Sequence, residues 1–189
     1  MSSNIIILEL PPSLYHLFLF ELDIKNKNIK NIKNFLIKEL PNQIDNFAIQ
    51  IVDAKLISGI NHIKFAAMQT LLAKSKIQNV SLRFITLISL EKQITKAISK
   101  LNLKSETALI CIISKNKEKT LKQIMDYTNV LDVTPTLKIS VNESTERLNN
   151  LQSFYGVNQN EFLSINKEIN LNSLASVLAE RMAIIANNI

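Results

Sequence analysis

The stretch from Ala108 to Ser114 is apolar at every position but the last. A strand with apolar side chains on both faces belongs in the interior of a sheet, where neighbouring strands pair with both of its edges. The sequence therefore predicts a central strand here. The lone cysteine of the chain, Cys111, lies within this strand. It is predicted to be a packing residue, because apolar surroundings disfavour the reactive thiolate.

Strand-like and helix-like stretches alternate along the rest of the chain. Strands are predicted where aromatic and β-branched residues are frequent, at Tyr15–Glu21, Phe47–Val52 and Leu82–Ser89, with a short edge strand at Leu137–Val141. Apolar residues at helical spacing predict helices at Asn28–Leu40, from Ile60 to Leu72, and at Glu91–Leu101, Lys117–Tyr127, Glu143–Tyr155 and Leu171–Asn187. This alternation predicts an α/β (α+β) fold in which helices cover a sheet.

Few residues mark turns or the ends of helices and strands, since the chain has only two glycines and four prolines. Ser58 or Asn61 is expected to cap the helix that follows Gly59. Asn102 is expected to take a left-handed conformation where the Glu91–Leu101 helix ends. Neither glycine begins a GxGxxG or GxxxxGK[ST] loop, so nucleotide binding of that kind is excluded.

Length and composition predict a single domain, residues 1–189, around a packed core. The chain has 189 residues, of which 47% are hydrophobic and 20% charged. One cysteine excludes an intrachain disulfide and fits a reducing compartment, so a cytoplasmic or nuclear location is expected. The longest apolar runs are far shorter than the roughly 20 residues that cross a bilayer. We therefore expect no contact with a membrane.

Catalytic chemistry has few candidate residues. His16 and His62 lie in no metal-binding pattern, and they are expected to pack beside a strand and at a helix start. Three carboxylates lie in no recognisable acid/base motif, namely Asp53, Asp126 and Asp132. The sequence therefore predicts no catalytic residue, no cofactor and no metal ion. One alternative hypothesis is nevertheless a small enzyme with an unrecognised carboxylate site.

Positive charge is concentrated in the middle of the chain. Residues 55–122 hold thirteen lysines and arginines against three acids, whereas both ends are mildly acidic. Such a distribution indicates a surface that attracts a polyanion, with nucleic acid as the first candidate. The alternative is an ordinary solvated surface. Lysines recur every four residues along the Glu91–Leu101 helix, and further lysines in or just after the preceding helix extend this ridge into a predicted patch. The predicted RNA-binding residues are Lys64, Lys74, Lys76, Lys92, Lys96 and Lys100.

The last predicted helix is apolar on more than one side. Leu174 and Met182 belong to the stripe expected to face the core, whereas Val177 and Ile184 lie off its centre. Two interpretations fit this pattern: the helix is deeply buried, or its second side binds a partner.

Packing and turn motifs spread over nearly the whole chain share the order found in one known family. They are Leu17–Phe20, Ile57–Ile63 leading into Ala66-Ala67, Leu82–Ser89 followed by Lys92–Ile98, and Phe154–Val157 followed by a helix with Leu178, Arg181 and Met182. In these features the chain resembles the kinase-binding subunit family of the KEOPS (EKC) complex, the TPRKB-like proteins.

The resemblance implies a mixed β-sheet flanked by helices, no active site, and tight binding to the small atypical (PRPK-like) kinase of the complex. It also implies indirect contact with other KEOPS subunits and help in recruiting tRNA for N6-threonylcarbamoyladenosine modification. The predicted kinase contact on the last helix comprises Val177, Leu178, Arg181, Ile184 and Ile185. The rival hypothesis is a stand-alone RNA-binding module without an obligate kinase partner.

Overall fold

A computed structural model of the chain describes residues 4–11, 14–24, 48–130, 133–138, 144–164 and 168–189. Contacts divide the chain into two units, and each is built from two separate segments. Unit 1 is Met1–Ala54 with Leu103–Leu137, and unit 2 is Lys55–Asn102 with Lys138–Ile189. The prediction of a single domain over residues 1–189 stays a prediction. The predicted helix at Asn28–Leu40, and most of the predicted edge strand at Leu137–Val141, lie outside the described residues.

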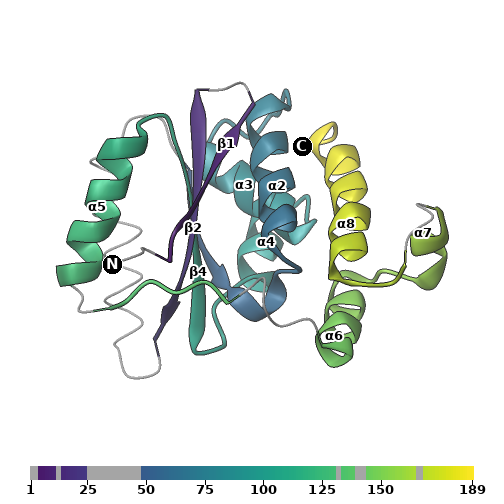
Figure 1. Cartoon of the computed structure of the whole chain (residues 1–189). Coiled ribbons are helices and arrows are strands. Elements are labelled where there is room, and N and C mark those ends of the chain that lie inside the picture. Colours follow the sequence, from purple (N-terminus) through teal and green to yellow (C-terminus); the bar gives the residue numbers. More distant parts are fainter. Residues whose placement is uncertain (1–3, 12–13, 25–47, 131–132, 139–143, 165–167) are drawn as a thin grey trace. The chain divides into compact units, whose positions relative to one another are not determined.

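Unit 1 contains a four-stranded sheet with a helix against one face (Figure 1). Its elements are β1 (Ile6–Leu10), β2 (Tyr15–Asp23), β3 (Ala48–Asp53), β4 (Thr107–Ser114) and α5 (Lys117–Val130). The strand order β1-β2-β4-β3 places β4 between two neighbours, which confirms the predicted central strand. The α/β class is also confirmed. The three pairings of the described strands are all antiparallel, however, where the family resemblance implied a mixed sheet.

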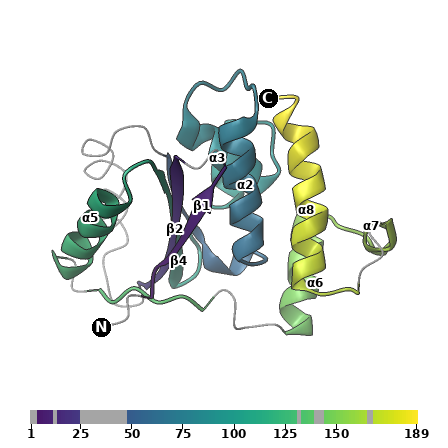
Figure 2. The same ribbon diagram turned by 45° about the horizontal axis from the view of Figure 1, so that its top comes forward.

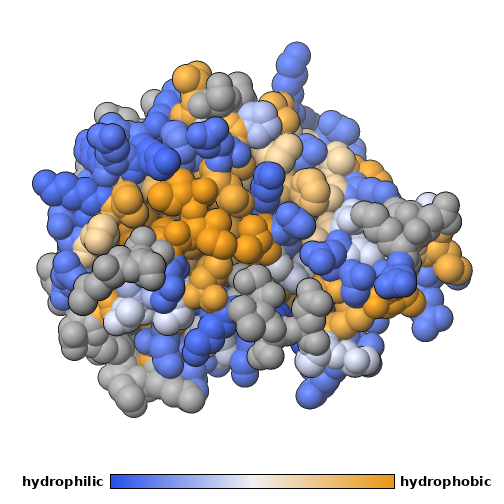
Figure 3. All heavy atoms as spheres, viewed as in Figure 1, coloured by the Kyte–Doolittle hydropathy of each residue, from blue (hydrophilic) through white to orange (hydrophobic). Residues whose placement is uncertain are grey.

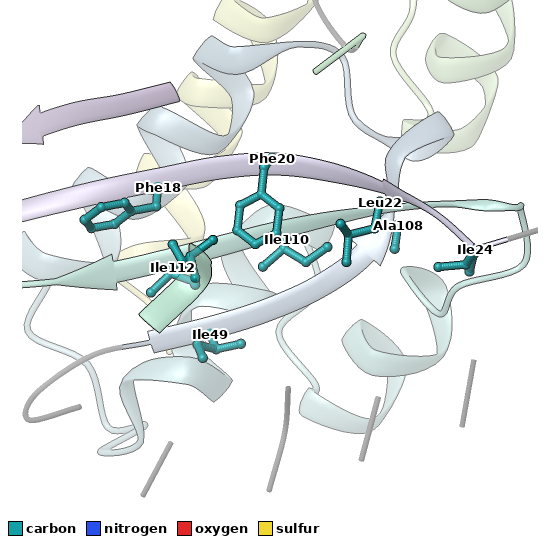
Figure 4. Close-up of a cluster of buried hydrophobic side chains, with 9 residues drawn as sticks. Phe18, Phe20, Leu22, Ile24, Ile49, Ala108, Ile110 and Ile112 are labelled. Atoms are coloured by element: carbon teal, nitrogen blue, oxygen red, sulfur yellow. The ribbon is translucent and has the colours of Figure 1, made fainter. Parts of the chain in front are cut away.

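One row of side chains crosses the whole sheet and forms part of the core of unit 1. Ile7 pairs with Phe18, Phe18 with Ile112, and Ile112 with Ile49. Figure 4 shows the buried side chains around this row. Helix α5 contributes Ile124 to the same cluster and so covers this face of the sheet. Because α5 follows β4 directly in the chain, the start of this helix lies beside the end of β4.

Unit 2 is helical in its described part (Figure 2). Its helices are α2 (Ile60–Leu72), α3 (Val80–Ser89), α4 (Ile94–Lys100), α6 (Thr145–Tyr155), α7 (Gln159–Ser164) and α8 (Leu171–Ala186). The short 3-10 helix η3 (Ala54–Leu56) precedes them and starts at the last residue of the first segment of unit 1. Helix α8 packs against α2, α3, α6 and α7. The predicted helices corresponding to α2, α4, α5, α6 and α8 are confirmed, whereas α7 was not predicted.

The predicted strand at Leu82–Ser89 is wrong, because these residues form most of α3. Asn79 caps this helix, since its Oδ1 accepts a hydrogen bond from the Leu82 N–H at 3.0 Å. Every residue from Phe84 to Ser89 is buried. A short run rich in aromatic and β-branched residues has the composition that strands favour, so residue type alone did not identify this helix.

The helix ends differ from those predicted at three positions. The N-cap of α2 is Gly59, and neither Ser58 nor Asn61 caps the helix with its side chain. Gly59 has a φ of 154°, which glycine adopts far more readily than other residues, so another residue at the cap would strain the backbone. Asn102 is not left-handed. Among the described residues other than glycine, Leu90 at the end of α3 alone has a positive φ, 58°.

Truncation of a side chain in the middle of β4 tests the sheet core. Ile110 is fully buried, so Ile110→Ala should lower the free energy of unfolding by about 2–5 kcal/mol, through lost burial and the cavity left behind. Met125 on α5 is 47% exposed, and Met125→Ala should change stability by about 0.5 kcal/mol or less. Urea unfolding measures both. Equal effects of the two substitutions would contradict the described core.

Candidate functional site

The structure separates the five residues predicted to contact a kinase. Val177, Leu178 and Ile185 are buried, whereas Ile184 is 63% exposed and Arg181 is half-buried. Of the two interpretations of α8, deep burial therefore applies to Val177, and the idea that this side chain lies on a free side is wrong. The reason is that α8 packs against four helices of unit 2, more than its sequence pattern could reveal. Kinase binding through Ile184 stays a prediction.

Arg181 joins α8 to the neighbouring helices α6 and α7. Its Nε and Nη2 donate to the two carboxylate oxygens of Glu161 at 2.9 and 2.8 Å. Its Nη1 and Nη2 also donate to the carbonyl oxygens of Tyr155 and Gly156, at 2.6 and 2.9 Å. These carbonyls end α6, where no further helical N–H can bond them. Arg181 therefore supports the fold of unit 2 through at least four donated hydrogen bonds.

The partner of Arg181 was missed in the sequence, although a local signal was present. Asn158 and Glu161 form a reciprocal cap at the start of α7: the Asn158 N–H donates to Glu161 Oε1, and the Glu161 N–H donates to Asn158 Oδ1. This Asn-x-x-Glu spacing is a known helix-start pattern. Burial alone would raise the pKa of Glu161, but the hydrogen bond from Asn158 and the bonds and charge of Arg181 outweigh it and lower the pKa.

The six lysines predicted to bind RNA all belong to unit 2, but their environments differ. Lys74, Lys76, Lys92 and Lys96 are exposed, and Lys64 and Lys100 are half-buried. Helix α4 begins only at Ile94, so Lys92 precedes it and the predicted helical ridge is reduced to Lys96 and Lys100. Of the six lysines, the four exposed ones are therefore the most accessible from solvent.

Lys100 is engaged with groups of its own unit. Its Nζ lies 2.9 Å from Glu91 Oε1. The same ammonium lies 5.4 Å from the centre of the Phe154 ring and 5.3 Å from that of Tyr155. Contacts with an acid and two aromatic faces stabilise a lysine where it is. Lys100 therefore connects α4 to α6 and is a weaker candidate for RNA binding than the exposed lysines.

His62 and Tyr155 are the buried polar centre of unit 2. The Ser58 N–H donates to His62 Nδ1 at 3.3 Å, so the ring proton is on Nε2, which lies 3.0 Å from the Ile88 carbonyl oxygen. The Tyr155 hydroxyl donates to the Leu56 carbonyl oxygen at 2.8 Å, and its ring packs edge-on against His62. Burial lowers the pKa of His62 to about 4, although its hydrogen bond to Ile88 acts in the opposite direction. The placement of His62 at a helix start is confirmed.

Asp53 and Cys111 were considered for catalysis, and both are buried in unit 1. Buried Asp53 accepts hydrogen bonds from the backbone N–H groups of Lys104 and Ser105, at 3.1 and 2.7 Å, and from the Ser105 hydroxyl. Burial raises the pKa of the Cys111 thiol. Asp126 is exposed, and Asp132 lies outside the described residues. Within the described ranges, no cluster of three potential metal ligands occurs, and no helix is long and apolar enough to span a membrane.

Acidification tests the neutral state of His62. Its pKa is about 6.5 when unfolded and about 4 when folded, so the unfolded chain binds the proton more tightly. The free energy of unfolding should therefore fall as the pH drops from about 6.5 to about 4, by about 3 kcal/mol in total from this group. His62→Gln should flatten this dependence, although it destabilises the chain at pH 7. Urea unfolding at a series of pH values measures it, and parallel profiles would contradict a buried neutral His62.

Comparison with known proteins identifies the family. The family model described as "Kinase binding protein CGI-121" matches residues 26–186, which is most of the chain. A search of curated proteins gave no match. The matched range includes unit 2 as far as Ala186 and the strands β3 and β4 of unit 1. The family resemblance inferred from the packing motifs is thereby confirmed. The chain belongs to the CGI-121 family of kinase-binding proteins.

Proposed function

We propose that this chain is a non-catalytic accessory subunit of a KEOPS-type complex. It binds the small atypical kinase of the complex and helps to recruit tRNA for N6-threonylcarbamoyladenosine modification. The observation that carries the proposal is the family match over residues 26–186, since that family is one of kinase-binding proteins. The chemistry of the modification then belongs to other subunits, and this chain contributes surfaces.

Two exposed aliphatic side chains on unit 2 support the kinase contact. Ile184 on α8 is 63% exposed and Leu72 at the end of α2 is 56% exposed. The Lys76 N–H donates to the Ile189 carbonyl oxygen at 2.8 Å, which joins the segment after α2 to the segment after α8. The two exposed side chains are therefore at the same end of a pair of packed helices. Exposed aliphatic residues of this kind bury apolar area when a partner docks.

A charged substitution at Ile184 tests the kinase contact. Ile184→Asp should weaken binding of the kinase by about tenfold or more, because an aspartate buried in an apolar interface loses its hydration. The fold should be kept, since the side chain is exposed. Co-purification and titration calorimetry with the kinase measure binding, and thermal unfolding measures the fold. Substitution of buried Val177 is unsuitable, because it would disrupt the interior of unit 2.

Asn172→Asp is the matched control for this experiment. Asn172 is exposed near the start of α8, so the variant adds the same negative charge to the same helix at a distance from Ile184. It should bind the kinase as the wild type does. Undiminished binding by Ile184→Asp would refute the proposed contact. A chain that captures tRNA and never the kinase would support the stand-alone RNA-binding module instead.

The tRNA contact is proposed for the exposed lysines of unit 2. Lys92→Glu with Lys96→Glu should weaken tRNA binding and reduce the slope of log affinity against log salt by about 1 for each lysine. The control is Lys92→Arg with Lys96→Arg, which keeps the charge and should keep the affinity. Fluorescence anisotropy at several salt concentrations measures both quantities. A salt slope that is the same in both double variants would contradict this contact.

A further inference from the structure

The edge strand β1 of unit 1 carries aliphatic side chains on both of its faces. It pairs with β2, and of the residues that the structure describes, none forms a strand on its other side. Ile5, just before β1, and Ile6, Ile7 and Leu8 within it are each only partly buried. Figure 3 shows hydrophobic side chains gathered over β1, left of the centre of the view. A strand with one face in solvent normally alternates apolar and polar residues, so this run indicates a contact surface.

The outer edge of β1 lacks the features that usually protect an edge strand, which are lysine, proline and β-bulges. Its sequence is IILEL, and its register with β2 is unbroken from the Ile6–Leu19 pair to the Leu10–Tyr15 pair. Across the described ranges, the residues of β1 form no backbone hydrogen bond outside their pairing with β2. The N–H and C=O groups that point outward can therefore pair with a further strand.

A second copy of this chain supplies a strand that matches this edge. Two β1 strands related by a twofold axis perpendicular to the sheet run antiparallel, and each residue of one strand then lies opposite a residue of the other. With the axis beside Ile7, Ile7 lies opposite Ile7 of the second copy, and Ile6 lies opposite its Leu8. Ile5 lies opposite Glu9 at the ends of the paired stretch. The partly exposed aliphatic residues are thus mainly covered by one another.

The position of Glu9, the one charged residue of β1, favours this register. Like charges that face each other destabilise a pair of strands. With the axis beside Ile7, the two Glu9 residues are separated by roughly 14 Å along the strands, at about 3.4 Å per residue. This separation exceeds the Debye length of about 8 Å at physiological salt, so the two carboxylates repel each other only weakly. An axis beside Leu8 would halve the separation.

We propose that this chain forms a dimer by antiparallel pairing of β1 with β1 of a second copy, which joins the two described sheets edge to edge. A copy brings an apolar strand of the same length by symmetry, and it needs no cation opposite Glu9. The pairing involves about five residues of each copy, fewer than the roughly 20–30 of a standard interface, so the dimer is weak and concentration-dependent. The inference goes beyond the proposed function, because β1 precedes the range that the family model matches.

Cysteine cross-linking tests this register in the full-length chain. Ile7→Cys should form a disulfide-linked dimer on mild oxidation, because the two introduced thiols face each other with their Cβ atoms about 5 Å apart. Cys111 is fully buried, so the wild type should form no such dimer. Met125→Cys, at an exposed position of α5, is the control for chance collisions and should cross-link more slowly by about tenfold or more. Non-reducing gels over a series of oxidation times measure the rates.

A charged substitution tests the same contact without a covalent bond. Ile7→Lys places two lysines opposite each other at the axis, so it should weaken dimerisation by about tenfold or more. Ile7→Val keeps an aliphatic side chain and should dimerise as the wild type does. Sedimentation velocity at micromolar to millimolar concentrations measures dimerisation, and circular dichroism checks the fold. If Ile7→Lys unfolds, the comparison of Ile7→Cys with Met125→Cys still decides.

The outcomes distinguish a second copy from other occupants of this edge. A dimer that Ile7→Lys weakens, together with rapid cross-linking of Ile7→Cys, supports the inference. A wild-type chain that stays monomeric overturns it, and so does cross-linking that is no faster at position 7 than at position 125. A dimer that Ile7→Lys leaves unchanged also overturns it. A monomer whose β1 amide protons become protected from exchange only when the kinase is added would assign this edge to the kinase instead.

Discussion

Burial of β4 along nearly its whole length is the constraint on which unit 1 depends. Every residue from Ala108 to Ser114 is buried, so β4 pairs with β2 on one edge and β3 on the other. Helix α5 follows directly and adds Ile124 to the cluster on one face of the sheet. The start of α5 is thereby tied to the end of β4, with the apolar side of the helix inward and its lysines in solvent. A core requirement thus positions a charged surface.

Unit 2 depends on three polar side chains that satisfy backbone groups away from regular structure. His62, Tyr155 and Arg181 bond the ends of helices and the segment before α2, where helical partners are lacking. Buried backbone groups without partners are costly, so these bonds decide how the helices meet. Arg181 and the buried residues of α8 therefore serve the fold, whereas Ile184 is exposed. The proposed kinase contact thus uses a residue of α8 that the fold does not bury.

Much of the fold could be predicted, because local pattern and burial agree in most elements. The central strand and the strands containing Phe18 and Ile49 consist largely of the residue types that strands favour, and helices α2, α5, α6 and α8 have apolar residues at helical spacing. Prediction failed at α3, where a short run rich in aromatic and β-branched residues was assigned to a strand by residue type. It also failed at the caps, since His62 and not Ser58 or Asn61 supplies the side-chain hydrogen bond before α2. Helix α7 was missed despite the Asn158–Glu161 pattern.

For the candidate site, the sequence by itself determined the family, the basic middle of the chain and the apolar excess of the last helix, because these depend on residue type and spacing alone. The tertiary structure decided which of those residues are available. It buries Val177 and exposes Ile184, gives Lys100 an acidic partner and two aromatic rings, and leaves Lys117 and Lys119 in solvent. The physical reason is that periodicity identifies the sides of a helix, whereas only long-range packing determines what covers each side.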